Sequence, residues 1–193
     1  MPKSIRFNKL GGPEVLHFED LPERHAGPGE VLLKIEAVGL NRAESMFYHG
    51  FYMEKVNVPS GLGYEAIGKV IAVGPEVDPA LIGKRFGTIP GFSMSQYPVL
   101  AEEAVVPASV LAAVPESFSA VEGAAVWMQY CTAYGALVPF GKVAAATSSS
   151  SQLPARPLGS RLSRSSRHRA ASPLRPPAAP PRRINSSTWA PTM

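Results

Sequence analysis

The stretch from Gly61 to Gly74, GLGYEAIGKVIAVG, limits most strongly what this chain can fold into. Its first residues are punctuated by glycines, which adopt turn conformations that other residues avoid. The residues after Glu65 alternate between the two faces of an apolar strand, and Pro75 ends it. A phosphate-binding loop needs a helix after its glycines. This stretch leads into a strand instead, so we expect it to organise a β-rich domain.

Similar short strands are predicted along most of the chain before residue 120. Their expected ranges are residues 4–8, 15–18, 30–39, 82–90, 101–106 and 110–114. Glycine and proline separate them, as in Gly11-Gly12-Pro13 and Gly27-Pro28-Gly29. Many short strands with such turns are typical of a β-barrel or a sandwich. The predicted fold class is therefore mainly β with short helices.

A first helix is predicted within residues 41–50, NRAESMFYHG. Asn41 is a good N-cap, because its side chain can accept a hydrogen bond from an unpaired backbone N–H of the first turn. Glu44 follows three residues later, which is the spacing of a capping box. Gly50 closes the segment in the place where a helix often ends on a glycine.

A second helical segment is predicted after Pro115, where the hydrophobic period changes. Ser119 and Glu122 again have the spacing of a capping box. Residues 120–138 lack proline and carry apolar side chains at helical intervals. We expect one or two helices here.

The last 50 residues have a different composition from the rest of the chain. Residues 144–193 hold eight Arg and no acid, whereas residues 1–143 hold 11 Lys and Arg against 15 Asp and Glu. The net charge of +4 therefore combines +8 in this tail with −4 before it. The tail is rich in Ser, Pro and Ala, and cannot bury enough apolar surface to offset about 1–2 kcal/mol of backbone entropy per residue. We expect it to be disordered.

The single cysteine, Cys131, excludes an internal disulfide and a zinc site built from several cysteines. The first residues, MPKSIRF, form no apolar signal segment, and no apolar run approaches the length that crosses a bilayer. We therefore expect a cytoplasmic protein that does not enter a membrane.

One set of residues carries a resemblance to a known family. The set consists of Val38-Gly39-Leu40-Asn41, Pro59, Gly63-Tyr64-Glu65, Gly68, Val70, Val73-Gly74 and Gly83-Lys84-Arg85-Phe86. Its combined spacing resembles the N-terminal half of the medium-chain dehydrogenase/reductase family. The later run WMQYCTAYGAL is similar to the family's helix that crosses into the cofactor domain. The resemblance covers roughly residues 1–143.

This resemblance implies a domain organisation. Residues 1–120 would form a GroES-like catalytic domain, and residues 121–143 a helical connection to a Rossmann domain. Residues 144–193 offer no apolar strand and no glycine cluster for that second domain. The tail is explained either by translation in a wrong reading frame or by a real disordered basic arm.

The residues that differ from the family pattern select a branch within the family. Zinc-containing members have Cys where this chain has Asn41 and His where it has Tyr64, and neither replacement is a good zinc ligand. No metal is therefore expected. The pattern is similar to the zinc-independent, quinone-oxidoreductase-like branch, whose members reduce quinones or enones with NADPH.

Asn41 and Tyr64 are the candidate catalytic residues that the resemblance implies. The Asn41 amide would bind the nicotinamide ribose or orient a substrate carbonyl, and its structural alternative is an ordinary helix N-cap. The Tyr64 hydroxyl would donate to a carbonyl oxygen that gains charge as hydride arrives. Its alternative is a pocket-lining aromatic side chain.

Four further residues are candidates for the cofactor site or the substrate pocket. Tyr52 matches a tyrosine that many zinc-independent members place near the nicotinamide, and Thr132 matches a threonine that contacts it. Trp127 and Met128, with Tyr52 and Tyr64, would line the substrate pocket. The structural alternatives are a solvent-facing loop aromatic for Tyr52, a hydrogen bond to its own helix for Thr132, and core packing for the other two.

The function that follows is a truncated NADPH-dependent oxidoreductase of the quinone or enone reductase type, which we expect to be inactive and not to bind NADPH as this chain alone. Two alternatives stay open. One is a non-catalytic module that pairs with a full-length relative or with a second copy through its second helical segment. The other, less favoured, is nucleic-acid binding through the Arg-rich tail.

Overall fold

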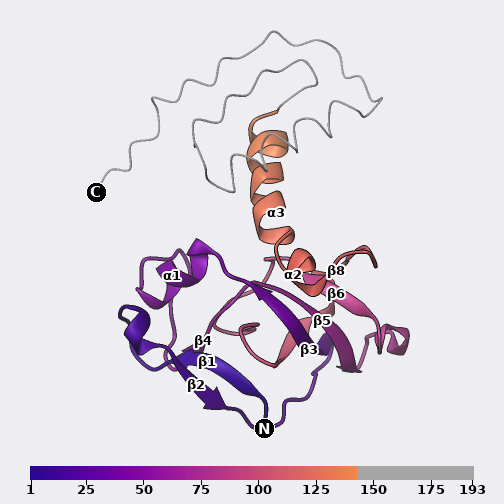
Figure 1. The fold of residues 1–193 in the computed structure, drawn as a ribbon, viewed down its shortest axis with the longest axis horizontal. Coiled ribbons are helices and arrows are strands. Elements are labelled where there is room, and N and C mark those ends of the chain that lie inside the picture. The colour runs from indigo at the N-terminus through magenta and orange to yellow at the C-terminus, as the bar shows by residue number, and fades with distance from the viewer. Residues whose placement is uncertain (143–193) are drawn as a thin grey trace. The chain divides into compact units, whose positions relative to one another are not determined.

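The computed structural model describes residues 1–142, so the predicted disordered tail at 144–193 lies outside the described residues. Residues Met1–Thr132 form one compact unit, and a second unit begins at Ala133. The fold class predicted from the sequence is confirmed: the first unit is mostly β-sheet with short helices (Figure 1).

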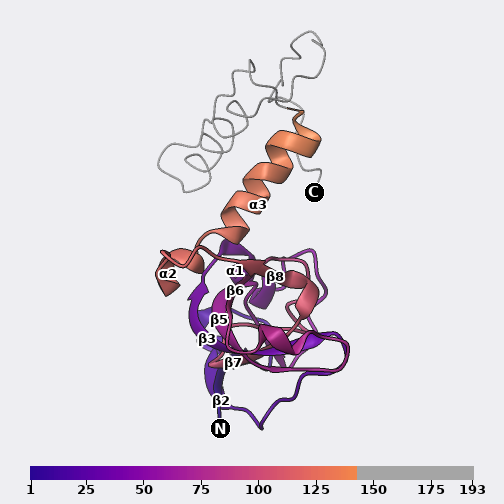
Figure 2. The same cartoon turned by 90° about the vertical axis from the view of Figure 1, so that its right-hand side faces the viewer.

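Two antiparallel sheets make up the first unit (Figures 1 and 2). The smaller sheet has the strand order β2-β1-β4, with β2 at His17–Asp20, β1 at Lys3–Phe7 and β4 at Ser60–Gly61. The larger sheet has the order β7-β3-β5-β6-β8, with β7 at Glu103–Pro107, β3 at Glu30–Gly39, β5 at Glu65–Val73, β6 at Arg85–Thr88 and β8 at Leu111–Ala113. The stretch that dominates the sequence therefore supplies the central strand, β5.

The pairing of β3 with β5 forms the middle of the larger sheet. Leu33 pairs with Val70, and both side chains are fully buried. The register shifts between Leu32 and Leu33 and again between Ile35 and Ala37. Strict alternation would put Leu32 on the face opposite Leu33, yet both are buried, because β3 is covered on both sides along this part.

The first two α-helices begin at the predicted caps, Asn41 and Ser119. Helix α1 spans Arg42–Tyr48 after Asn41, and Gly50 follows it with φ +80°, a conformation that favours glycine. Helix α2 is short, at Ala120–Gly123, and α3 spans Trp127–Gly135. The sequence predicted one or two helices within residues 120–138, and the structure has two. Ala136–Phe140 then continues as a π-helical turn that contains Pro139.

Two predicted strands are displaced or shortened by 3-10 turns. The expected strand at 15–18 starts only at His17, because Pro13–Val15 forms a turn that buries Val15. The expected strand at 82–90 is reduced to β6, Arg85–Thr88, after a turn at Pro79–Leu81. A third turn, Ala108–Val110, separates β7 from β8. In each case a proline at or near the start of the turn sets the backbone angle that a turn needs.

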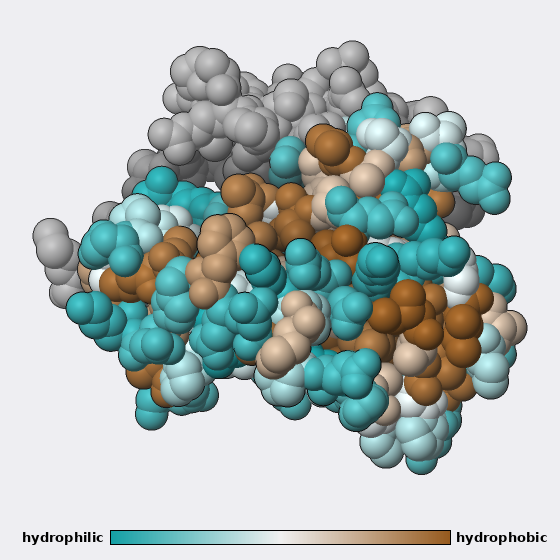
Figure 3. Space-filling view, turned by 60° about the horizontal axis from the view of Figure 1, so that its bottom comes forward, coloured by the Kyte–Doolittle hydropathy of each residue, from teal (hydrophilic) through white to brown (hydrophobic). Residues whose placement is uncertain are grey.

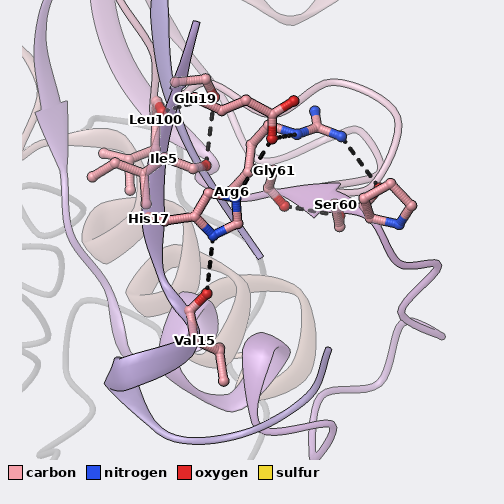
Figure 4. A network of polar contacts seen from close by, with 10 residues as sticks. Ile5, Arg6, Val15, His17, Glu19, Ser60, Gly61 and Leu100 are labelled. Atoms are coloured by element: carbon pink, nitrogen blue, oxygen red, sulfur yellow. Dashed lines mark hydrogen bonds and ion pairs between the residues drawn. The ribbon is translucent and has the colours of Figure 1, made fainter. Parts of the chain in front are cut away.

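A polar network joins neighbouring strands of the smaller sheet (Figure 4). The Glu19 carboxylate lies 3.3 Å from Arg6 Nε and 3.5 Å from His17 Nε2, so β1 and β2 share one acid. Arg6 also donates to the carbonyl oxygen of Pro59 at 3.4 Å. These contacts connect β2, β1 and the approach to β4 across one sheet.

The surface of the described residues combines polar and apolar areas, and Figure 3 shows brown apolar patches between teal polar ones. Large apolar side chains with more than half of their area exposed include Phe18, Leu40, Phe51, Met53 and Val121. Within residues 1–142, no helix has the length and apolarity that crossing a membrane would require.

We predict that Leu33→Ala lowers the free energy of unfolding by about 2–5 kcal/mol, because Leu33 is fully buried and its removal leaves a cavity in the core. Urea unfolding of the full chain measures the change. Ile82→Ala is the matched control, since half of Ile82 is exposed, and it should cost less than about 1 kcal/mol. Equal losses in the two variants would contradict the placement of Leu33 in the core.

Candidate functional site

Two buried glutamates lie where the loop after β3 meets the start of β5. Glu44 is 4% exposed and Glu65 is 1% exposed. A buried carboxylate is costly unless hydrogen bonds satisfy it. Each of these two accepts hydrogen bonds from neighbouring segments, and the predicted site residues Asn41 and Tyr64 are among the donors.

Asn41 connects the two acids. Its backbone N–H donates to Glu44 Oε2 at 2.8 Å, which is the capping-box contact expected from the sequence. Its side-chain amide donates to Glu65 Oε2 at 3.2 Å and to the carbonyl oxygen of Gly39 at 3.3 Å. Both amide hydrogens of Asn41 are therefore used inside the domain. Its amide oxygen accepts from the backbone N–H of Glu44 in the capping box, and its second lone pair keeps capacity for a ligand.

Glu65 also holds the start of α3. Its Oε1 accepts from the backbone N–H of Met128, the second residue of the helix, at 3.0 Å. A carboxylate at this position satisfies one of the unpaired N–H groups of the first turn and interacts favourably with the helix dipole. Gly39 makes room for it, because a Cβ at position 39 would lie 2.6 Å from Glu65 Oε2.

Glu44 completes this arrangement from α1. Its Oε1 accepts from the backbone N–H of Tyr64 at 3.2 Å, so Glu44 binds both Asn41 and Tyr64 through their backbones. Burial raises the pKa of Glu44 above 4.5, and the nearby Glu65 raises it further, while the hydrogen bonds from backbone N–H groups oppose the change.

The Tyr64 hydroxyl already has an acceptor in this structure. It donates to Glu54 Oε2 at 3.1 Å, and Glu54 belongs to the loop between α1 and β4. Burial raises the pKa of the Tyr64 phenol, and its contacts with Tyr52 and with the Glu54 carboxylate raise it further. Tyr64 is therefore a neutral phenol at every pH at which the domain is expected to work.

Three of the four residues predicted for the pocket meet in one cluster. Tyr52 and Met128 both pack against the core group that contains Tyr64. The ring centroids of Tyr52 and Tyr64 are 6.1 Å apart, and Phe92 lies edge-on to Tyr64 at 5.5 Å. The structure thus places Tyr52 and Met128 on the core group that contains Tyr64, and the two glutamates link Asn41 to the backbones of Tyr64 and Met128.

Trp127 and Thr132 lie differently. The Trp127 ring packs against β6, since its Nε1 would be 2.5 Å from a Cβ at Gly87. The Thr132 hydroxyl donates to the carbonyl oxygen of Met128, four residues earlier, at 2.7 Å, which is the structural alternative stated for it above. Their roles in a pocket or a cofactor site stay predictions.

Sequence analysis missed Glu54 and Ser93. Glu54 accepts hydrogen bonds from the Ser93 hydroxyl and from the backbone N–H groups of Met94 and Ser95, at 3.1 and 3.3 Å, besides the one from Tyr64. Ser93, Met94 and Ser95 lie 39 to 41 residues away along the chain and Tyr64 lies 10 residues away, so no local pattern could have identified them. An acid in a loop of apolar and aromatic residues is the one signal that the sequence offers.

Two surface hollows lie away from these residues. One of about 320 Å³ is lined by Arg24, His25, Glu30, Gln96, Tyr97 and Val105. Another, of about 870 Å³, is lined by Met1, Pro2, Pro22, Glu23, Lys34, Ile35, Glu102 and Glu103. Both are open to solvent, and neither includes a predicted site residue. In the described part of the chain, His, Cys, Asp and Glu side chains form no group of three that could hold a metal ion.

Comparisons with known proteins agree on one kind of domain. The family model described as the alcohol dehydrogenase GroES-like domain matches residues 27–116. A quinone oxidoreductase of Pseudomonas aeruginosa is 42% identical over 108 residues, which cover 55% of this chain and 33% of that protein. The chain thus spans about a third of the length of this relative.

Solved structures give the same result. A quinone oxidoreductase of Pseudomonas syringae pv. Tomato DC3000 matches with a TM-score of 0.67 and 33% identity, over 75% of this chain and 43% of that one. The Escherichia coli quinone oxidoreductase in complex with NADPH matches with a TM-score of 0.61 and 28% identity, over 71% of this chain and 40% of that one. The shared part includes less than half of each of these structures.

The raised pKa of Glu44 predicts a specific dependence of stability on pH. In the folded chain Glu44 binds its proton more tightly than in the unfolded chain, so it lowers the unfolding free energy as the pH rises from 4.5 through the raised pKa. Relative to Glu44→Gln, the wild type should therefore gain stability as the pH is lowered from neutral through this window.

Urea unfolding of both chains at a series of pH values measures this difference. Glu122→Gln is the matched control of opposite sign, because hydrogen bonds from Ser119 lower the pKa of Glu122, and the stability it provides is lost on acidification below 4.5. A wild type that loses stability relative to Glu44→Gln on acidification would contradict the raised pKa of Glu44.

Proposed function

Because this chain carries the GroES-like part of a quinone-oxidoreductase-like member of the medium-chain dehydrogenase/reductase family, we propose that residues 1–132 are the substrate-side domain of an oxidoreductase. The proposed reaction is hydride transfer from NADPH to a quinone or to another carbonyl-activated alkene. The observation that carries the proposal is the cluster of Tyr52, Tyr64 and Met128 beside Asn41, within a domain of this kind.

The free acceptor capacity of the Asn41 amide oxygen fits the nicotinamide ribose of a dinucleotide. With both amide hydrogens engaged by Gly39 and Glu65, the Asn41 oxygen can only accept a hydrogen bond. A ribose hydroxyl supplies the donor that such an oxygen needs, whereas a substrate carbonyl does not. Of the two roles considered for Asn41, binding the nicotinamide ribose is therefore the better supported one.

The phosphates of the cofactor need a binding site of another kind than the one at Asn41. Pyrophosphate is held where a strand leads through a glycine turn into the N-terminus of a helix. Among residues 1–142, the glycine-rich segment at 61–74 leads into β5, and neither α1 nor α3 follows such a turn. When bound, NADPH would supply the hydride, and the residues of this domain would position the acceptor.

The residues of the cluster would then act on the acceptor. Aromatic rings at Tyr52 and Tyr64 offer flat apolar surfaces against which a planar quinone can stack. Met128 adds an adaptable apolar wall. If Tyr64 is to donate to the substrate oxygen, its proton has to move away from Glu54, to which it is bound in this structure.

Binding of a quinone to this chain tests the proposed site directly. Duroquinone is a suitable probe, because all of its ring carbons are substituted and it does not alkylate Cys131. In NMR titrations of the full chain we expect shifts centred on Asn41, Tyr52, Tyr64 and Met128. Tyr52→Ala, which removes the stacking ring, should weaken this binding, whereas Tyr134→Ala, at a largely exposed position, should leave it unchanged. Shifts confined to other parts of the domain would refute the proposed site.

NADPH binding tests whether this chain can hold the cofactor without a pyrophosphate site among its described residues. Because the described residues offer no pyrophosphate site, we expect the full chain to leave NADPH fluorescence unchanged. We also expect it to oxidise NADPH with duroquinone no faster than buffer does. The quinone oxidoreductase of Escherichia coli, whose structure contains NADPH, is the positive control for the same assay. Saturable NADPH binding by this chain would overturn the expectation and place a cofactor site within it.

A further inference from the structure

Glu54, in the loop between α1 and β4, accepts four hydrogen bonds through its side chain. Its Oε1 accepts from the Ser93 hydroxyl and from the backbone N–H of Ser95 at 3.3 Å. Its Oε2 accepts from the Tyr64 hydroxyl and from the backbone N–H of Met94, each at 3.1 Å. A carboxylate has about four lone-pair sites, so four donors from two distant segments saturate it.

The four donors fix the charge state of this acid. Burial by itself would raise the pKa of Glu54, but the hydrogen bonds from Ser93, Met94, Ser95 and Tyr64 outweigh burial and hold that pKa below its usual range. Glu54 is therefore a carboxylate near neutral pH. No described Lys or Arg forms an ion pair with it, so neutral donors alone compensate its charge.

The direction of the proton between Tyr64 and Glu54 follows from this charge. A carboxylate can only accept, so the Tyr64 hydroxyl is the donor. Hydrogen bonds to a charged acceptor are roughly twice as strong as neutral ones.

We propose that Glu54 is a positioning residue of the candidate pocket, which holds the Tyr64 hydroxyl as a donor and ties the 51–59 loop to residues 93–95. It acts through Tyr64 and does not itself contact a ligand. A ligand in the pocket can therefore donate a hydrogen bond to the Tyr64 oxygen. To accept the Tyr64 proton instead, the ligand has to displace the Glu54 carboxylate from it. The identity of that ligand rests on the proposed function, whereas the contact between Glu54 and Tyr64 does not.

The titration of Tyr64 is a readout that a purely structural role of Glu54 would not move. The titratable groups around Tyr64 are Tyr52 and Glu54 at its hydroxyl and Glu44 at its backbone N–H. Tyrosine labelled with ¹³C at Cζ reports ionisation and hydrogen bonding of each phenol, and Tyr64→Phe assigns the resonance. In the wild type we expect Tyr64 to stay protonated above pH 10, the ordinary pKa of a tyrosine.

Glu54→Gln removes the charge and keeps the size of the side chain. We expect the acid dissociation constant of Tyr64 to increase at least tenfold, because a phenolate no longer faces a carboxylate. Glu30→Gln is the matched control, since Glu30 accepts from the Tyr97 hydroxyl at 2.8 Å in the same way. It should change the titration of Tyr97 and leave that of Tyr64 as it is.

A second variant keeps the test decisive if Glu54→Gln does not fold. Ser93→Ala removes one donor from Glu54 without touching Tyr64, so the carboxylate should bind the Tyr64 proton more strongly and shift its ¹³Cζ resonance. An unchanged Tyr64 titration in folded Glu54→Gln, or an unchanged resonance in Ser93→Ala, would overturn the proposal. The titration uses no ligand, so failure of the proposed function, seen as absent quinone binding, would leave its outcome readable.

Discussion

The hydrogen bonds of the buried Glu65 carboxylate are the contacts on which the arrangement of the candidate site depends. Glu65 begins the central strand β5, and it accepts from the side chain of Asn41 and from the backbone of Met128. One acid thus relates three segments that are far apart in the sequence. A buried carboxylate without these donors would cost several kcal/mol, so the position of each donor is strongly constrained.

The same network limits what the site can do chemically. The donors that sequence analysis assigned to a substrate are already bound within the protein: those of Asn41 to Gly39 and Glu65, and that of Tyr64 to Glu54. In the structure these hydrogen bonds point inward, toward other residues of the domain. What remains available is mainly acceptor oxygen and aromatic surface, which suits a hydroxyl-bearing cofactor and a flat apolar substrate.

Features set by short-range rules could be predicted from the sequence. The N-cap at Asn41, the capping box of Ser119 with Glu122 and the strand after Glu65 depend on residues within a few positions of one another. The shifts of register in β3 could not be predicted, because they depend on two neighbouring strands. The role of Glu54 was invisible for the same reason, since its donors come from Tyr64 and from residues 93–95.

Glu44 and Glu54 show how the fold sets the charge of two like residues within one site. Glu44 is nearly completely buried and lies near Glu65, so burial and like charge dominate and its pKa rises. Glu54 receives hydroxyl as well as backbone donors, and these outweigh burial, so its pKa falls. The balance between burial with like charge on one side and hydrogen-bond donors on the other decides the outcome. A negative charge is therefore kept at Glu54, beside the Tyr64 hydroxyl, and disfavoured at Glu44, beneath it.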